Sequence, residues 1–269
     1  MRIIELLVID PQNDFCDPQG SLFVKGADED MTRLAKFVDQ FGSKLSDINV
    51  TFDSHQDIDI AHPYFWVNSK GENPKPFTII HAADVDAGTW LPAVPSKSRR
   101  DRAVAYVKQL EPNGRYPLCI WPVHCVIGEW GHNVYKPLQD SLRNWSRKNF
   151  ATINPVTKGS NPWTEHYSAV KAEVPDPQDE STRLNKAFIA KLQKCDEIII
   201  AGEALSHCVA NTVRDVAEAF GDDSYVQKLV LLTDASSNVT GFENFGDQFL
   251  KDMTARGMRT TTTKDYVAA

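Results

Sequence analysis

The sequence predicts an α/β fold with three layers, in which a mostly parallel sheet of about six strands lies between two layers of helices. Apolar runs rich in β-branched residues alternate along the chain with stretches of helical periodicity. The strand runs are apolar almost throughout, as expected when helices cover both faces of a parallel sheet. The chain has 269 residues, of which 42% are hydrophobic, so it can bury a full core.

The predicted elements follow one another in a regular order. Six runs have the composition of strands, namely residues 3–10, 48–53, 77–80, 150–153, 197–202 and 226–234. Four stretches have helical spacing, namely residues 31–45, 181–195, 208–220 and 242–257. In the third of these helices the apolar positions Val209, Val213, Val216 and Phe220 form one face, which we expect to be buried.

The chain reads as one domain, residues 1–269, with a long insertion at about residues 63–115. This insertion is rich in Pro, Lys and Asn, and it interrupts the alternation of strands and helices. Residues 78–92 and 98–112 within it suggest a strand, a loop and a helix. We expect this segment to act as a lid or to reshape a pocket.

Composition excludes several classes of protein. The net charge of −7 disfavours a nucleic-acid partner, because such proteins usually carry a basic surface that matches the phosphates. We find no apolar run of membrane-spanning length and no N-terminal signal pattern. The five cysteines show no CxxC spacing, which disfavours a disulfide framework. These features predict a cytoplasmic protein without a membrane partner.

Three chemically useful residues follow predicted strands. Asp10 and Asp53 close the first two strands, and Cys208 opens the helix after strand 197–202. In open parallel sheets the site lies at the carboxyl ends of the strands. A thiol in the first turn of a helix is close to unpaired N–H groups, which favour the thiolate. Cys208 is then either a nucleophile or a small buried residue of the core.

A second group of residues has the composition of a metal site. Residues 52–62, "FDSHQDIDIAH", contain Asp53, His55 and His62, and His124 follows within "WPVHC". One carboxylate with two or three imidazoles is a normal ligand set for zinc or another divalent transition metal. The alternative is that these histidines are scattered over loops while Asp53 caps a turn.

Six motifs resemble, in order and context, those of nicotinamidases in the isochorismatase-like cysteine hydrolase family. They are "VIDPQNDFC" (8–16), "FDSHQDIDIAH" (52–62), "WPVHCV" (121–126), "TKG" (157–159), "YSA" (167–169) and "GEALSHCV" (202–209). The resemblance extends from residue 2 to about residue 235. It implies the isochorismatase-like hydrolase fold and hydrolysis of nicotinamide to nicotinate and ammonia.

The resemblance also implies roles for individual residues. The catalytic residues are then Asp10, Lys158 and Cys208, and the N–H groups of Ala204 and Cys208 form the oxyanion hole. A divalent metal, with zinc expected, is then held by Asp53, His55 and His124, with His62 as a further ligand. Substrate-binding aromatic residues are then Phe15, Trp121 and Tyr167, and a cis peptide bond falls between Glu203 and Ala204.

Several alternatives stay open at this point. The substrate is a small-molecule amide, but Val170 stands where nicotinamidases tend to carry an aromatic residue, so another amide or a ureido compound also fits. A metal-bound water can replace the thiol as nucleophile, with Cys208 as a bystander. A binding protein that keeps the fold is a third reading. The sequence leaves open whether the chain forms a homo-oligomer.

Overall fold

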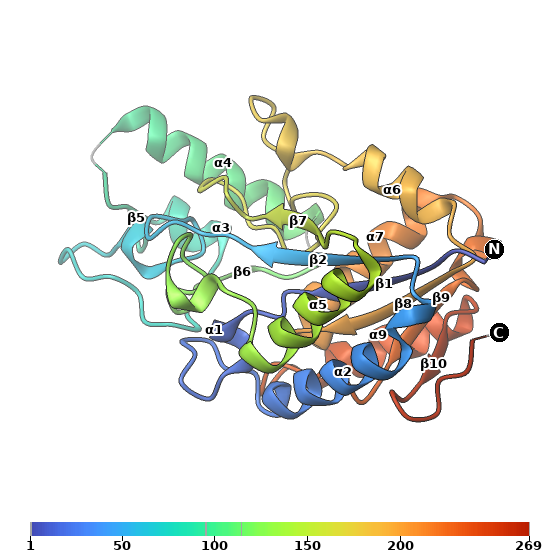
Figure 1. The fold of residues 1–269 in the computed structure, drawn as a ribbon. Helices are drawn as coiled ribbons and strands as arrows, with labels where there is room; N and C mark the ends of the chain where they lie inside the picture. Colours follow the sequence, from blue (N-terminus) through green and yellow to red (C-terminus); the bar gives the residue numbers. More distant parts are fainter. Residues whose placement is uncertain (1, 95, 114, 269) are drawn as a thin grey trace.

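The computed structural model describes residues 2–94, 96–113 and 115–268, and its centre is a six-stranded sheet (Figure 1). The strands of this sheet are β1 (Ile4–Ile9), β2 (Asp47–Asp53), β7 (Asn154–Lys158), β8 (Glu197–Gly202), β9 (Leu229–Leu232) and β10 (Arg259–Thr261). Their spatial order is β10-β9-β8-β1-β2-β7, and all neighbours pair in parallel. The predicted α/β class is therefore confirmed.

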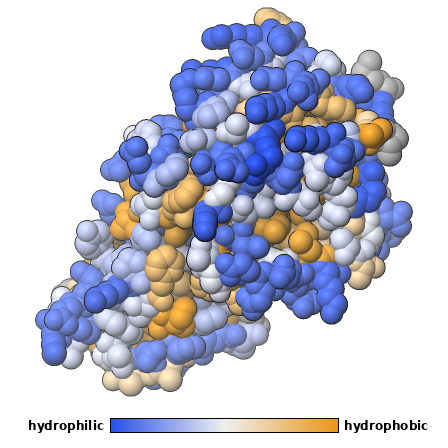
Figure 2. Space-filling view, turned by 90° about the horizontal axis from the view of Figure 1, so that it is seen from below, coloured by the Kyte–Doolittle hydropathy of each residue, from blue (hydrophilic) through white to orange (hydrophobic). Residues whose placement is uncertain are grey.

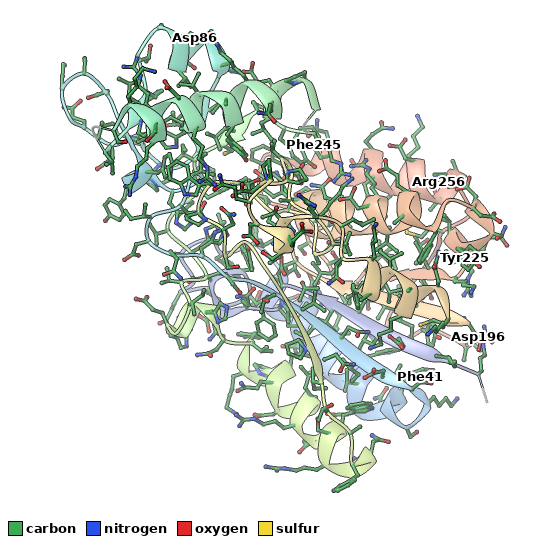
Figure 3. The ribbon with its side chains drawn as sticks, turned by 90° about the horizontal axis from the view of Figure 1, so that it is seen from above. Phe41, Asp86, Asp196, Tyr225, Phe245 and Arg256 are labelled. Carbon is green, nitrogen blue, oxygen red and sulfur yellow. The ribbon has the colours of Figure 1, made fainter. Side chains whose placement is uncertain are left out.

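Helices cover both faces of the sheet (Figures 1 and 3). On one face α2 (Ala27–Phe41) packs against α5 (Lys136–Asn149), and on the other lie α6 (Lys186–Gln193), α7 (Ala210–Phe220) and α9 (Glu243–Ala255). Two short helices, α1 (Asn13–Cys16) and α8 (Asp223–Val226), follow β1 and α7. The central strands β1, β8 and β9 are buried at every position, as a sheet covered on both faces requires.

The register of the sheet gathers the predicted site residues. Asp53 pairs with Lys158 across β2 and β7, and Ile9 pairs with Gly202 across β1 and β8. Asp10, directly after Ile9, and Glu203, directly after Gly202, therefore leave the same edge of the sheet. This edge is the carboxyl end of the strands, where a parallel sheet places its ligand site.

The described residues 63–94 and 96–113 of the predicted insertion stand beyond this edge, at the end of the molecule away from the two termini (Figure 1). This segment contains α3 (Ala82–Asp86) and α4 (Lys97–Asn113), together with strands β3 (Trp66–Val67) and β5 (Leu91–Pro92), which pair antiparallel. A further antiparallel pair joins β4 (Ile79–Ile80) to β6 (Leu118–Cys119). Because β6 runs directly into Trp121 and His124, this segment is continuous with the site.

Three details of the predicted elements are wrong. Residues 79–80 form a strand, but it pairs with β6 outside the central sheet. The fourth predicted strand begins four residues late, at Asn154, because Phe150 takes a left-handed backbone (φ 50°) and ends α5. The last strand of the central sheet, β10, was not predicted, because it is short and polar and therefore lacks the apolar composition of a buried strand.

The structure also adds elements to the prediction. The helix α5 was not predicted, although Leu138, Leu142 and Trp145 form a buried stripe with helical spacing. Charged and amide side chains surround this stripe and hide it in the sequence. Hydrophilic residues also dominate the face of the molecule shown in Figure 2, with smaller hydrophobic areas between them. Within the described residues, no helix has the length and apolar character that crossing a bilayer requires.

Candidate active site

Lys158 is the centre of a buried polar cluster at the carboxyl edge of the sheet. Its Nζ lies 3.1 Å from Asp10 Oδ2, 2.9 Å from Asp53 Oδ1 and 3.7 Å from Cys208 Sγ. It also donates a hydrogen bond of 2.9 Å to the carbonyl oxygen of His166. Each of these side chains is less than a tenth exposed. The predicted residues Asp10, Lys158 and Cys208, here called the trio, are thus brought together.

The charges within this cluster are strongly coupled. Burial raises the pKa of Asp10, although the Lys158 ammonium opposes this effect. Burial alone would lower the pKa of Lys158. The carboxylates of Asp10 and Asp53 outweigh this effect and raise the pKa well above its ordinary value. Lys158 therefore carries a positive charge beside both carboxyl groups.

The thiol of Cys208 differs from the thiolate that the sequence suggested. Burial raises the pKa of Cys208 well above its ordinary value, and the opposing effect of Lys158 does not compensate. Asp10 and Asp53 add negative charge that also raises this pKa. The resting residue is therefore a protonated thiol, and it needs a base before it can act as a nucleophile.

The turn between β8 and α7 places Cys208 in a different conformation from the predicted helix start. Leu205–Val209 form a π-helical turn, and the α-helix begins only at Ala210. The N–H groups of His207 and Val209 both donate to the Ala204 carbonyl, at 3.0 and 3.1 Å. The peptide bond between Glu203 and Ala204 is cis, as the resemblance implied. Ala204 and Cys208 both line the same pocket.

Three imidazoles lie together beside the trio. The potential ligand atoms of His55, His62 and His124 all lie within 4.8 Å of one another, and all three residues are buried. Asp53 Oδ2 lies 3.1 Å from His55 Nε2 and 3.4 Å from His124 Nε2. Although Asp53 Oδ2 is this close, it does not have hydrogen-bond geometry towards His55 Nε2, and this buried nitrogen has no other partner among the described residues. This donor set fits a divalent transition metal.

Neighbouring groups orient these imidazoles. Asp59 Oδ2 lies 3.0 Å from His55 Nδ1, and the Gln56 carbonyl lies 3.1 Å from His62 Nδ1. Metal-binding histidines usually hold their second ring nitrogen in this way. Burial lowers the pKa of His62 to about 3, which keeps this imidazole neutral, as a ligand must be. Burial also acts to lower the pKa of His55, but the carboxylates of Asp53 and Asp59 outweigh it and raise that pKa well above its ordinary value. We did not predict Asp59, although its position four residues after His55 is a signal in the sequence.

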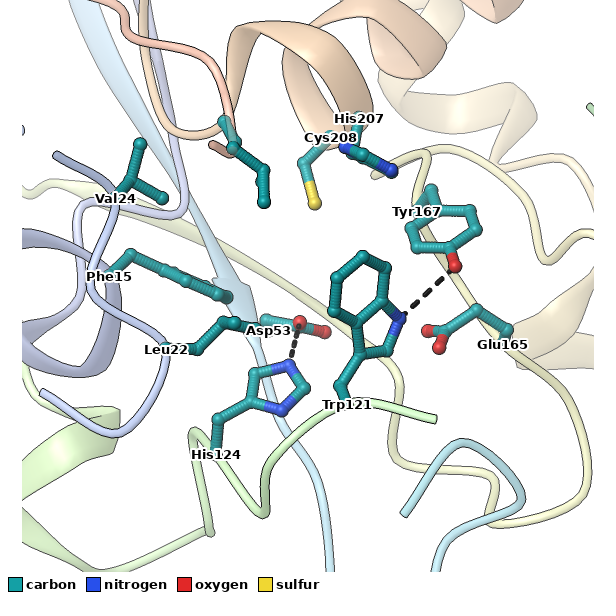
Figure 4. Close-up of a pocket in the computed structure, with 12 residues that line it drawn as sticks. Phe15, Leu22, Val24, Asp53, Trp121, His124, Glu165, Tyr167, His207 and Cys208 are labelled. Atoms are coloured by element: carbon teal, nitrogen blue, oxygen red, sulfur yellow. Dashed lines mark hydrogen bonds and ion pairs between the residues drawn. The ribbon is translucent and has the colours of Figure 1, made fainter. Parts of the chain in front are cut away.

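A pocket opens at Cys208, and all three predicted aromatic residues line it (Figure 4). The Cys208 sulfur points into the space between Phe15 and Trp121. Tyr167 accepts a hydrogen bond of 3.1 Å from Trp121 Nε1 and thereby fixes the indole ring. These apolar walls suit a flat aromatic ligand.

Two further residues of this pocket were missed. Glu165 is fully buried, its Oε2 has no partner among the described residues, and burial raises its pKa to about 7. His207 also lines the pocket, where its ring stacks on Tyr116 at a centroid distance of 4.8 Å. His207 forms no hydrogen bond with Cys208 in the described structure, because its Nδ1 lies 2.9 Å from Ser206 Oγ. Glu165 lies outside the quoted motifs, whereas His207 lies within "GEALSHCV", directly before Cys208.

The chain is similar to known nicotinamidases and pyrazinamidases. A nicotinamidase of Saccharomyces cerevisiae is 27% identical over 214 residues, which are 79% of this chain and 81% of the relative. The solved structure of the yeast nicotinamidase gives a TM-score of 0.64 at 21% identity, with 96% of this chain and 99% of that chain covered.

A pyrazinamidase of Pyrococcus horikoshii, solved in complex with zinc, gives a TM-score of 0.55 at 19% identity, with 96% and 98% covered. A scan against protein-family models finds none that matches the chain. The sequence similarity to a nicotinamidase extends over most of the chain, and the structural similarity extends over nearly all of it. The chain therefore has the isochorismatase-like hydrolase fold of the nicotinamidases and pyrazinamidases.

Proposed function

We propose that this protein is a hydrolase that converts nicotinamide into nicotinate and ammonia through a thioester on Cys208. The observation that carries the proposal is the position of Lys158, whose ammonium contacts both Asp10 and Cys208 in a buried cluster. The similarity to a yeast nicotinamidase supports the same reaction. This reaction would place the protein in the salvage of pyridine nucleotides.

In the first step the Cys208 sulfur attacks the carbonyl carbon of the amide. The raised pKa of the thiol means that a base must accept its proton, and the raised pKa of Asp10 makes this carboxylate a better base. Lys158 holds Asp10 in place and stabilises negative charge that develops on the sulfur. A carbon–sulfur bond forms, and the electron pair of the C=O bond moves to oxygen.

The Ala204 and Cys208 N–H groups would bind this oxyanion, an effect on the order of 3 kcal/mol for each donor. The tetrahedral intermediate collapses when Asp10 gives its proton to the amide nitrogen and ammonia leaves. Asp10 then takes a proton from water, whose oxygen attacks the thioester, and the carbon–sulfur bond breaks. Nicotinate leaves, and the proton returns to the sulfur, so Cys208 is a thiol again.

The residues Asp53, His55, His62 and His124 would hold a divalent metal, which we propose to be zinc. When bound, the metal would supply a Lewis acid for the pyridine nitrogen and so fix the ring relative to the sulfur. Phe15 and Trp121 would enclose the ring, since both line the pocket. The nucleophile in this proposal is the thiol, so the metal's contribution is to orient the substrate.

Ammonia release from nicotinamide by the purified protein with added zinc tests the function. We expect Cys208→Ala to abolish the release, whereas Cys119→Ala, which removes a buried thiol of β6, should retain it. Release that survives Cys208→Ala would show that the thiol is a bystander and would favour a metal-bound water. No release by the wild-type protein would contradict nicotinamide as the substrate and favour another small amide or a ureido compound.

Location and assembly remain predictions. A cytoplasmic location follows from the sequence pattern alone, and a homo-oligomer is tested by light scattering of the purified protein. Neither property enters the proposed chemistry, because every residue that it uses comes from one chain.

A further inference from the structure

Two carboxyl groups are buried together behind the turn that carries Ala204. Glu203 directly precedes Ala204 and is 0% exposed, and Asp30 of α2 is 3% exposed. Oε1 of Glu203 finds no hydrogen-bond partner among the described residues, and the nearby carboxyl group of Asp30 raises the pKa of Glu203 beyond the larger effect of burial. Two ionised carboxylates cannot bond to each other, because both are acceptors. A proton on one of them supplies the missing donor.

The charges around this pair indicate which carboxyl carries the proton. Arg33 of α2 donates to Asp30 Oδ1 at 2.5 Å, so the guanidinium compensates the charge of Asp30. Glu203 has no such cation within contact distance in the described structure, and a buried unpaired carboxylate is costly. The thiol of Cys16 in α1 also lies near the pair. Burial raises the pKa of this thiol, and the negative charges of Glu203 and Asp30 raise it further. Asp30 and Glu203 therefore compete for one cation, and Glu203 is the neutral partner.

Ser237, in the loop after β9, connects the pair to the active site. Its N–H donates to Glu203 Oε2 at 3.0 Å, and its hydroxyl donates to Asp30 Oδ2 at 2.5 Å. Its carbonyl oxygen accepts the N–H of Leu205 at 2.8 Å. Two residues later in the same loop, Val239 lines the pocket, and its N–H donates to Ser206 Oγ at 3.1 Å. This loop and the turn at Ala204 are therefore held as one unit.

We propose that Glu203 is a positioning residue that must stay protonated, and that its neutral carboxyl joins Asp30 to Ser237 and fixes the Ala204 N–H in the oxyanion hole. The proposal rests on the proposed function for its effect on catalysis. A proton on Glu203 also matters electrostatically, because a carboxylate beside Ala204 would oppose the negative charge on the oxyanion. Ionised Glu203 would in addition repel Asp30 and separate the turn from the loop.

Infrared difference spectroscopy tests the protonation state without any substrate. At neutral pH the wild-type protein should show the C=O band of a protonated, buried carboxyl group, and this band should be lost in Glu203→Gln. The side chain of glutamine imitates the neutral acid, so we expect this variant to fold. Absence of the band from the difference spectrum would overturn the proposal, whether or not the protein hydrolyses nicotinamide.

Kinetics then test the positioning role. Glu203→Gln should retain most of the wild-type kcat. At alkaline pH the kcat of the wild type should decrease, whereas the kcat of this variant should not. Glu203→Leu should lower kcat about tenfold or more while KM changes less, because an oxyanion donor acts mainly in the transition state. Equal pH profiles for the wild type and Glu203→Gln would contradict the proposal.

Asp30→Asn provides an independent variant if Glu203→Leu does not fold. Removal of the neighbouring negative charge should lower the pKa of Glu203, so the alkaline fall in kcat should move to lower pH. An unmoved profile would show that Glu203 does not control the oxyanion hole. If the wild-type protein releases no ammonia from nicotinamide, the proposed function fails, and the infrared result alone decides the protonation of Glu203.

Discussion

The side-chain amide of Gln12 binds the backbone of Asp53 through both of its polar atoms. Nε2 donates to the Asp53 carbonyl and Oε1 accepts the Asp53 N–H, each at 2.7 Å. Gln12 is 0% exposed, so water cannot replace either bond. The loop after β1 thereby fixes the end of β2, from which Asp53 faces both Lys158 and the imidazoles.

Replacement of Gln12 by alanine should therefore weaken both the fold and the metal site. We expect Gln12→Ala to lower the free energy of unfolding by about 2 kcal/mol, because two buried backbone groups lose their partners. Zinc affinity should fall roughly tenfold, since the orientation of Asp53 is lost. Urea unfolding and calorimetric zinc titration measure these effects. The exposed Gln19→Ala is the control, and equal zinc affinity in the two variants would contradict the prediction.

Thr51 should set the basicity of Asp10. Its hydroxyl oxygen accepts the Asp10 N–H at 2.9 Å, and the hydroxyl donates to Asp10 Oδ1. This second bond lowers the pKa of Asp10, against the larger effect of burial. Thr51→Val should raise the pKa of Asp10 further, so that the acidic limb of the kcat/KM profile moves to higher pH. Thr51→Ser keeps the hydroxyl and should keep the profile. A profile that does not move in Thr51→Val would argue that Asp10 is not the base.

Glu165 should make the stability of the metal-free protein depend on pH. Burial raises its pKa to about 7, so the folded protein binds a proton more tightly than the unfolded chain. This contribution to stability is complete below the pKa of the unfolded state and is lost as pH rises towards about 7. The loss should be on the order of 3 kcal/mol. Glu165→Gln should abolish this dependence, which urea unfolding from pH 4 to pH 8 would measure. If the free energy of unfolding changes with pH by the same amount in the wild type and in Glu165→Gln, the role of Glu165 is contradicted.

Removal of the metal should weaken the binding of the substrate and leave the arrangement of Asp10, Lys158 and Cys208 intact. With the metal chelated, we expect KM for nicotinamide to rise at least about tenfold, because the ring loses its anchor while the trio stays assembled. His62→Ala should reduce zinc affinity by a similar factor, whereas His81→Ala alters an exposed histidine and should not. Unchanged affinity in His62→Ala would remove this residue from the ligand set. Added zinc should restore the activity of the chelated wild type.

The sequence predicted the residues that follow strands much better than the contacts between elements. Asp10 and Asp53 could be expected at one edge because strand ends in a parallel sheet must meet there, whereas Lys158 was predicted only from its motif, since the predicted strand ended at residue 153. Gln12 and Asp59 could not be assigned a role, because their partners depend on how two loops fold onto each other. Glu203 is a similar case, since its burial depends on α2 and on the loop after β9.

The errors in the secondary structure have physical causes of the same kind. The strand at residues 79–80 has the expected composition, but the choice of its partner, β6, is a tertiary property. The start of the helix at Cys208 was misjudged because a π-helical turn and an α-helix share the same side-chain types. The predicted thiolate is wrong chiefly because burial raises the pKa of the thiol, and the strand and helix patterns in the sequence do not show how deeply the sulfur is buried.

The residues proposed to cleave the bond and some of those proposed to hold the ligand come from different parts of the chain. The trio is built on the central sheet, at the ends of β1 and β7 and in the turn after β8, whereas Trp121 and His124 belong to the connection that leaves the segment of residues 63–115. Insertions or substitutions in that connection can alter which molecule is admitted while the sheet keeps Asp10, Lys158 and Cys208 in register. An engineer who wishes to change the substrate should therefore diversify the residues around Trp121 and leave the sheet untouched.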